Sequence, residues 1–99
     1  MSPGPRPLGD IEPVFPPEAG LREGLVVLRI FINEAGVVDR VTVLRSTPAD
    51  VFDESAITAF AAARFSPGRV LGVPVKSQIT IEVAFTPFNR GATVSGRSY

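Results

Sequence analysis

The amino-acid sequence predicts a single α+β domain in which strands and one alanine-rich helix share a hydrophobic core. Residues 25–32, LVVLRIFI, are apolar at every position except Arg29, and their branched side chains favour a strand over a short helix. Residues 75–85 alternate apolar and polar side chains, which is typical of a strand with one buried face. From a chain of 99 residues we expect one hydrophobic core and no second domain.

The first two strands are expected to form a hairpin. Turn residues at 33–36 end in Gly36, which can adopt a positive φ, and a valine-rich strand follows from Val37 to Ser46. The valines of this second strand depart from strict alternation, so we expect a β-bulge near Asp39 and Arg40. The fully apolar face of the first strand comprises Val26, Leu28, Ile30 and Ile32.

A long helix is predicted from Asp53 to Arg64. Acidic residues at its start and Arg64 at its end complement the helix dipole, and Thr47-Pro48-Ala49-Asp50 marks a helix start or a lead-in turn. Pro67-Gly68 would stop the helix before the strand Val75 to Phe85. One helical face carries Phe52, Ala56, Ile57, Phe60 and Ala63 at three- and four-residue spacing.

The chain divides into three expected parts. Prolines are dense in the first 17 residues and favour extended backbone, so residues 1–12 are interpreted as the end of a linker. Residues 13–87 are the expected domain, with a short helical turn at residues 17–20. Residues 88–99 are polar and of low complexity, which predicts a flexible tail. No apolar run approaches the roughly 20 residues that cross a bilayer.

The composition argues against several classes of function. Ten acidic residues balance ten basic ones without a Lys/Arg cluster along the sequence, which disfavours nucleic acid or an anionic lipid surface as a partner. Histidine and cysteine are absent, which removes the commonest general base, the thiolate nucleophile and the usual zinc ligands. We therefore expect no catalytic residue, no cofactor and no metal.

Two apparent catalytic groups have structural explanations. Asp53 and Glu54 are adjacent on the predicted helix, where side chains point about 100° apart, and helix starts favour acidic residues. Ser46 and Thr47 have no histidine to activate them, so a turn or capping role is expected. The sequence thus indicates a binding module and not an enzyme.

An ordered set of short segments resembles the TonB C-terminal domain family. The segments span roughly residues 13 to 86. They are Phe15-Pro16 followed by Ala19; Gly24 leading into VVLRIFI; residues 33–38, NEAGVV; Arg45-Ser46-Thr47; Phe52-Asp53 with Ser55-Ala56-Ile57; Arg64-Phe65-Ser66-Pro67; and Gly72-Val73-Pro74-Val75. The chain departs from the family pattern in having Phe15-Pro16 for Tyr-Pro, no glutamine-proline element in residues 9–12, and Thr47-Pro48 for Ser-Gly.

The resemblance implies a three-stranded antiparallel sheet with one long and one short helix packed on one face, in which the hairpin of residues 25–46 pairs with residues 75–85. It also implies a periplasmic domain of an energy transducer anchored in the inner membrane. Such transducers couple to the proton-driven ExbB and ExbD motor, here through a segment not present in these residues. They bind a short peptide, the TonB box, of outer-membrane transporters for nutrient uptake.

Strand addition is the expected binding mechanism, because an open sheet edge offers unpaired N–H and C=O groups to an extended peptide. We expect the edge at Ser77 to Ala84, with Gln78, Thr80 and Glu82 flanking the peptide. The predicted partner-binding residues are Phe15, Pro16, Ser77, Gln78, Ile79, Thr80, Ile81, Glu82, Val83 and Ala84.

Alternatives remain at this stage. The polar residues of the edge strand also suit an ordinary solvent-facing surface, and Phe15-Pro16 suits a lid on the core as well as a groove for a partner. The same edge could pair with a second copy of the chain, giving a homodimer with a structural role. A signalling or envelope protein could also use this module with another partner.

Overall fold

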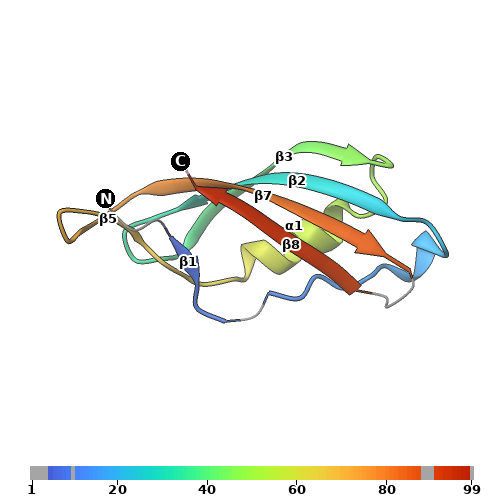
Figure 1. Cartoon of the computed structure of the whole chain (residues 1–99), viewed down its shortest axis with the longest axis horizontal. Helices are drawn as coiled ribbons and strands as arrows, with labels where there is room; N and C mark the ends of the chain where they lie inside the picture. The colour runs from blue at the N-terminus through green and yellow to red at the C-terminus, as the bar shows by residue number, and fades with distance from the viewer. Residues whose placement is uncertain (1–4, 10, 88–90, 99) are drawn as a thin grey trace.

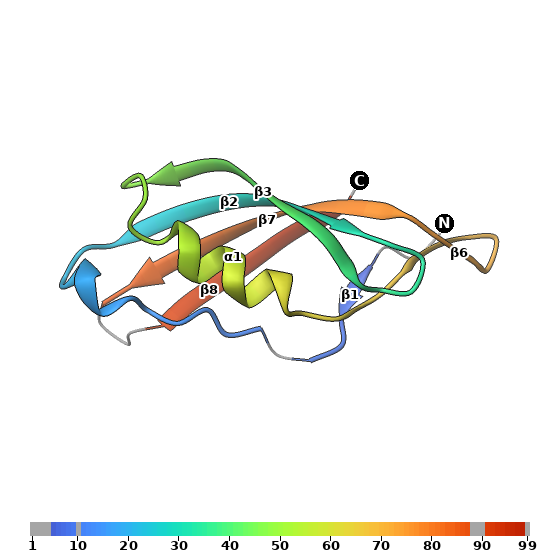
Figure 2. The same cartoon turned by 180° about the vertical axis from the view of Figure 1, so that it is seen from behind.

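The computed structural model describes residues 5–9, 11–87 and 91–98, and the side chains of the first two ranges. In chain order the elements are β1 (Arg6–Pro7), η1 (Pro17–Ala19), β2 (Gly24–Ile32), β3 (Val38–Thr47), α1 (Asp53–Ala61), β4 (Phe65–Ser66), β5 (Gly68–Val70), β6 (Val73–Val75), β7 (Ser77–Thr86) and β8 (Gly91–Ser98). Helix α1 lies along one face of a long sheet, and the β5–β6 hairpin projects at one end of the molecule (Figures 1 and 2).

The main sheet has the strand order β3-β2-β7-β8, and its neighbouring strands are antiparallel. The three predicted strands are present as β2, β3 and β7, with the expected neighbours. The described sheet has four strands and not three, because residues 91–98 form β8 where a flexible tail was expected. The remaining residues of that predicted tail, 88–90 and 99, lie outside the described residues.

The core lies between α1 and the sheet face that α1 covers. The predicted apolar faces are buried there: the even positions of β2 from Val26 to Ile32, the odd positions of β7 from Ile79 to Phe85, and Phe52, Ala56 and Phe60 of the helix face. Ile57 and Ala63 are partly buried against this core. Two-residue periodicity in the strands and helical periodicity in α1 therefore point towards one shared interior.

The hairpin turn after β2 is held by Asn33. Its Oδ1 atom accepts hydrogen bonds from the N–H groups of Ala35 at 2.9 Å and Val37 at 3.0 Å. Gly36 has φ of +83°, as the turn chemistry predicted. The β2–β3 register shifts once at Asp39, which confirms the predicted bulge, and once more at Leu44, which was not predicted.

Helix α1 ends at Ala61, one turn earlier than the sequence predicted. Arg64 forms a β-bridge with Val37, and the N–H of Phe65 donates to the carbonyl of Gly36 at 3.0 Å. These bonds to the hairpin turn replace the last helical turn. Residues 47–52 form the connection that leads into α1, as the second of the two expectations had it. Thr47 does not cap the helix, because the N-cap position is Phe52.

The expected short helical turn is a 3-10 turn, η1. Arg22 supports it, because its Nε donates to the carbonyl of Ala19 at 3.0 Å and its Nη2 to that of Glu18 at 2.9 Å. Ala19 is buried against the core. No helix among the described residues is long and apolar enough to cross a membrane.

Part of the predicted linker is paired to the domain. Strand β1 pairs with β4, and the N–H of Leu8 donates to the carbonyl of Arg64 at 2.9 Å. The backbone there is extended, as the prolines predicted, but it is not a free spacer. Residues 1–4 and 10 of the predicted linker lie outside the described residues.

Candidate partner-binding edge of the sheet

The described sheet has two outer strands, β3 and β8. Strand β3 carries the two bulges, at Asp39 and Leu44, and the exposed residues Arg40 and Arg45 lie beside them. Bulges and charged side chains are common devices that prevent a sheet edge from pairing with another chain. This edge is therefore poorly suited to accept an extended peptide.

The other side of the sheet is regular. Strand β8 pairs with β7 without a register shift from Ile79 opposite Ser98 to Thr86 opposite Gly91. The predicted edge strand is therefore an inner strand over residues 79–86, and the expectation of an open edge is corrected for residues 79–84. The reason is that main-chain groups of residues 91–98 satisfy the outer groups of β7. No described residue of β8 faces Ser77 or Gln78.

The side chains of the predicted partner-binding strand divide between two faces. Ile79, Ile81 and Val83 are buried in the core, so they are not available to a partner. Gln78 and Glu82 are exposed on the face that α1 does not cover. Thr80 and Ala84 are half-buried on that same face. The alternation of buried and exposed side chains is as predicted, and the expectation that Gln78, Thr80 and Glu82 flank a bound peptide stays a prediction.

A comparison with protein-family models matches residues 11–87 to the family described as Gram-negative bacterial TonB protein C-terminal. The chain belongs to this family. A comparison with curated proteins found no match. The match includes all the strands of the sheet except β8, together with α1 and η1.

Membership of this family defines the class of the molecule. The chain is a TonB-type periplasmic domain of a Gram-negative envelope transport protein, from a family of non-enzymatic transducers that interact with outer-membrane transporters. Among the described residues, no group of three or more acidic side chains could hold a metal ion.

Phe15 lies in the core of the TonB-type domain and is only 5% exposed. Its ring centroid is 5.5 Å from that of Phe52 and 6.5 Å from that of Phe85, both in edge-on geometry. Phe52 and Phe85 stack with their centroids 4.7 Å apart. Of the two interpretations of Phe15 made from the sequence, this position matches a lid on the core.

Pro16, although buried, lines a groove of about 410 Å³ between the N-terminal segment and α1. The hydroxyl of Ser55 donates to the carbonyl of Val14 across one side of the groove. Glu12, Glu18, Asp50 and Glu54 also line the groove. Pro16 and Phe15 are therefore both buried, but Pro16 belongs to the wall of the groove whereas Phe15 faces the core, and contact of Pro16 with a partner stays a prediction.

Arg29 is a residue of the uncovered sheet face that sequence reasoning did not assign to the site. It stands opposite Thr80 in the β2–β7 register. Arg29 Nε and Thr80 Oγ1 are both buried atoms without a hydrogen-bond partner among the described residues. The only signal in the sequence was that Arg29 interrupts an otherwise apolar strand.

Proposed function

We propose that this TonB-type domain binds the TonB box of an outer-membrane transporter by strand pairing at the β7–β8 side of the sheet. The pairing would transmit work derived from the proton-motive force, supplied by ExbB and ExbD acting through a segment outside these residues. The full-length protein would be anchored in the inner membrane, with this domain in the periplasm.

The observation that carries the proposal is the unbroken pairing of β7 with β8. Eight register pairs, from Ile79 to Thr86, leave β7 without a bulge on its outer side. An extended peptide of similar length finds the same row of main-chain groups if β8 leaves. The bulged edge of β3 offers no comparable row.

Strand β8 is suited to being exchanged. Its sequence, GATVSGRS, contains Gly91 and Gly96, and glycine weakens a strand because it has high backbone entropy and no side chain to pack. Each main-chain hydrogen bond contributes about 0.5–1.5 kcal/mol net, and a peptide that replaces β8 restores the bonds it breaks. The net affinity then depends on contacts of the peptide with side chains such as Gln78, Thr80 and Glu82. Such a balance favours reversible binding.

Displacement of β8 can be distinguished from addition to its outer edge. We would titrate isotope-labelled protein with a synthetic TonB-box peptide of a transporter from the same organism, and follow the backbone amides by NMR. Displacement predicts shifts along Ser77 to Phe85 together with loss of hydrogen-exchange protection in β8. Addition predicts new protection in β8 while its pairing with β7 is kept.

A proline variant provides a second test that distinguishes displacement from addition. Val94→Pro removes a donor in the middle of β8, opposite Val83, and should weaken its pairing. Under displacement this variant binds the peptide more tightly, whereas under addition it binds more weakly. The absence of shifts with peptides from several transporters at millimolar concentration would refute the proposed function.

Self-association is the second candidate, because β8 is an outer strand of the described sheet. A copy of the chain could pair there, giving a homodimer with a structural role in the envelope. A native dimer would keep its size down to micromolar concentration and would not bind the peptide. Competition between the peptide and dimerisation would mark the dimer as incidental.

A further inference from the structure

The β5–β6 hairpin exposes three aliphatic side chains at its tip. Val70, Leu71 and Val73 are 52%, 96% and 60% exposed. The hairpin extends beyond the end of the main sheet, away from α1 and from η1 (Figures 1 and 2). None of these side chains belongs to the core, and Val70 and Val73 pair across the hairpin. Together with Leu71 they form an exposed apolar tip, and such a patch is more informative than an isolated exposed residue.

The backbone at the tip is also unusual. Leu71 has φ of +51° and Gly72 has φ of +81°, so both central residues of the turn are left-handed. Such turns normally carry Asn-Gly or Asp-Gly, because a large side chain is disfavoured at positive φ. Leu71 therefore adopts an unfavourable conformation while almost its entire side chain faces solvent. A residue that costs stability and packs against nothing indicates a role outside the domain.

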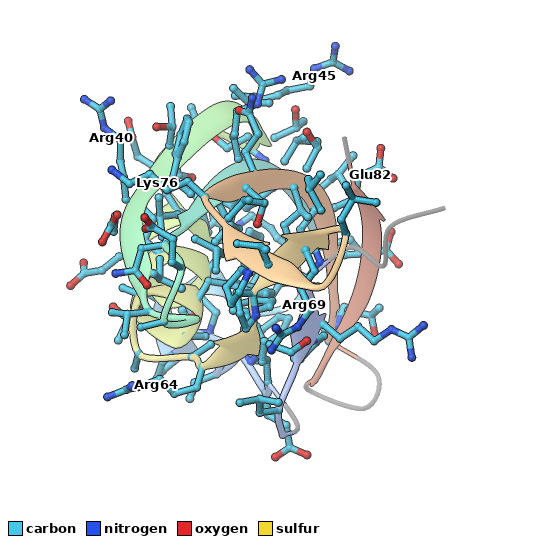
Figure 3. The ribbon with its side chains drawn as sticks, turned by 90° about the vertical axis from the view of Figure 1, so that its left-hand side faces the viewer. Arg40, Arg45, Arg64, Arg69, Lys76 and Glu82 are labelled. Carbon is cyan, nitrogen blue, oxygen red and sulfur yellow. The ribbon has the colours of Figure 1, made fainter. Side chains whose placement is uncertain are left out.

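Basic side chains surround this end of the molecule. Arg69 lies within the hairpin, where its Nη1 donates to the carbonyl of Gly72 at 3.1 Å, and Lys76 directly follows the hairpin. Arg6 lies in β1, and Arg64 immediately precedes β4, the strand that pairs with β1. Arg40 lies at the neighbouring end of β3. Figure 3 looks onto this end and shows Arg40, Arg64 and Lys76 directed outward around the hairpin.

The charges of the domain are segregated although its net charge is zero. Glu34 and Asp39 are the acidic residues of the hairpin turn beside the tip, and they are outnumbered by the surrounding basic residues. Four carboxylates instead line the groove near η1: Glu12, Glu18, Asp50 and Glu54. Leu21, which is 89% exposed, follows η1 at that end. The adjacent Arg22 is bonded to the carbonyls of Ala19 and Glu18, and the four carboxylates of the groove outnumber it.

We propose that the β5–β6 tip docks onto an anionic phospholipid surface. Val70, Leu71 and Val73 enter the headgroup region, and Arg69, Lys76 and the neighbouring arginines contact lipid phosphates. An anionic bilayer has negative charge at its surface and apolar acyl chains beneath the headgroups. Aliphatic side chains at the tip and basic side chains around it are complementary to these two layers. Because Lys76 leads directly into β7, docking would hold the start of β7 near the membrane. This proposal does not depend on peptide binding at β7–β8.

Binding of the intact chain to large unilamellar vesicles tests the proposal. We expect co-sedimentation with vesicles of phosphatidylcholine containing 30 mol% phosphatidylglycerol, decreasing as salt is raised, and little with phosphatidylcholine alone. Leu71→Asn places the residue that this turn prefers at the tip, so the variant should fold at least as well. We expect it to lower the partition coefficient by about tenfold or more. Leu21→Asn, at the acidic end, should bind as the unmodified chain.

Two variants that each remove one positive charge provide a second test. Lys76→Gln should lower partitioning about fivefold, since one cation near the surface is removed. Arg45→Gln removes the same charge far along β3 and should have little effect. Equal binding of Leu71→Asn and the unmodified chain would overturn the proposal, as would equal binding to neutral and anionic vesicles. Absence of vesicle binding would overturn it too and would leave a protein partner as the occupant of the tip.

Discussion

The ring of Phe52 packs directly on Gly24, so that a β-carbon at position 24 would lie 2.1 Å from Phe52 Cδ2. Phe52 immediately precedes α1, and Gly24 begins β2, so this contact joins the start of the helix to the sheet. Phe85 of β7, which stands opposite Gly24, stacks on the same ring. The absence of a side chain at position 24 lets these aromatic rings close the core.

Replacing Gly24 with alanine should destabilise the domain. The added methyl group must displace the fully buried Phe52 ring, and overpacking of this kind costs about 1–3 kcal/mol. Urea unfolding followed by far-UV circular dichroism measures the loss. Gly9→Ala is the matched control, because a β-carbon added at Gly9 would meet nothing within 4 Å and φ there is not positive. A Gly24→Ala protein as stable as the control would contradict the close contact.

The hairpin turn predicts a difference between two glycines with nearly the same backbone angle. Gly36→Ala would place a β-carbon 1.9 Å from the Phe65 carbonyl oxygen, in addition to the strain of φ +83°. Gly72→Ala has φ +81° but meets nothing within 4 Å, so it reports the backbone cost alone. We expect about 1 kcal/mol for Gly72→Ala and at least about 3 kcal/mol for Gly36→Ala. Equal losses in chemical unfolding would show that the contact with Phe65 is not important.

Asn33 should contribute to stability through its side chain. Asn33→Ala removes the acceptor of the N–H groups of Ala35 and Val37, and we expect a loss of about 1–2 kcal/mol. Glu34→Ala, at an exposed position of the same turn, should change stability by less than about 0.5 kcal/mol. Amide exchange at Ala35 and Val37 would accelerate in the first variant and not in the second. Unchanged exchange at both amides would contradict the role of Asn33.

Phe15 and Val14 are neighbours with opposite exposure, 5% and 73%. Phe15→Ala should lower the free energy of unfolding by about 3–5 kcal/mol, because it leaves a cavity beside the stacked rings of Phe52 and Phe85. Val14→Ala should have an effect of less than about 0.5 kcal/mol. Under conditions in which both variants are folded, neither should change TonB-box affinity. A selective loss of affinity in Phe15→Ala would instead place Phe15 in the partner interface.

Several features of the fold could be predicted because their causes are local. The buried faces of β2 and β7 follow from two-residue alternation, and the turn at Gly36 follows from its need for positive φ. The bulge at Asp39 was visible as a break in the valine pattern. The strand from Ser77 to Ala84 and the division of its side chains between two faces follow from the same alternation, whereas their role in partner binding stays a prediction.

Other features could not be predicted, since they depend on contacts between distant segments. The end of α1 is decided by Arg64 and Phe65 bonding to the hairpin turn, although the apolar helical pattern continues to Ala63. Strand β8 has no alternating apolar pattern, because its pairing with β7 uses main-chain groups that every residue carries. The open edge expected at β7 was therefore wrong for this structure.

The sequence alone determined the family, the strands β2, β3 and β7, and the position of the helix. Periodicity and turn chemistry act over a few residues, so they can be recognised without the structure. Only the tertiary structure decided that β8 covers β7 and that cations gather around the β5–β6 tip. Lys76, Arg64 and Arg40 are separated along the chain, and a net charge of zero conceals their clustering. The pairing of β8 with β7 and the clustering of cations both depend on contacts between segments that are distant in the sequence. A pattern within a few consecutive residues does not contain information about such contacts.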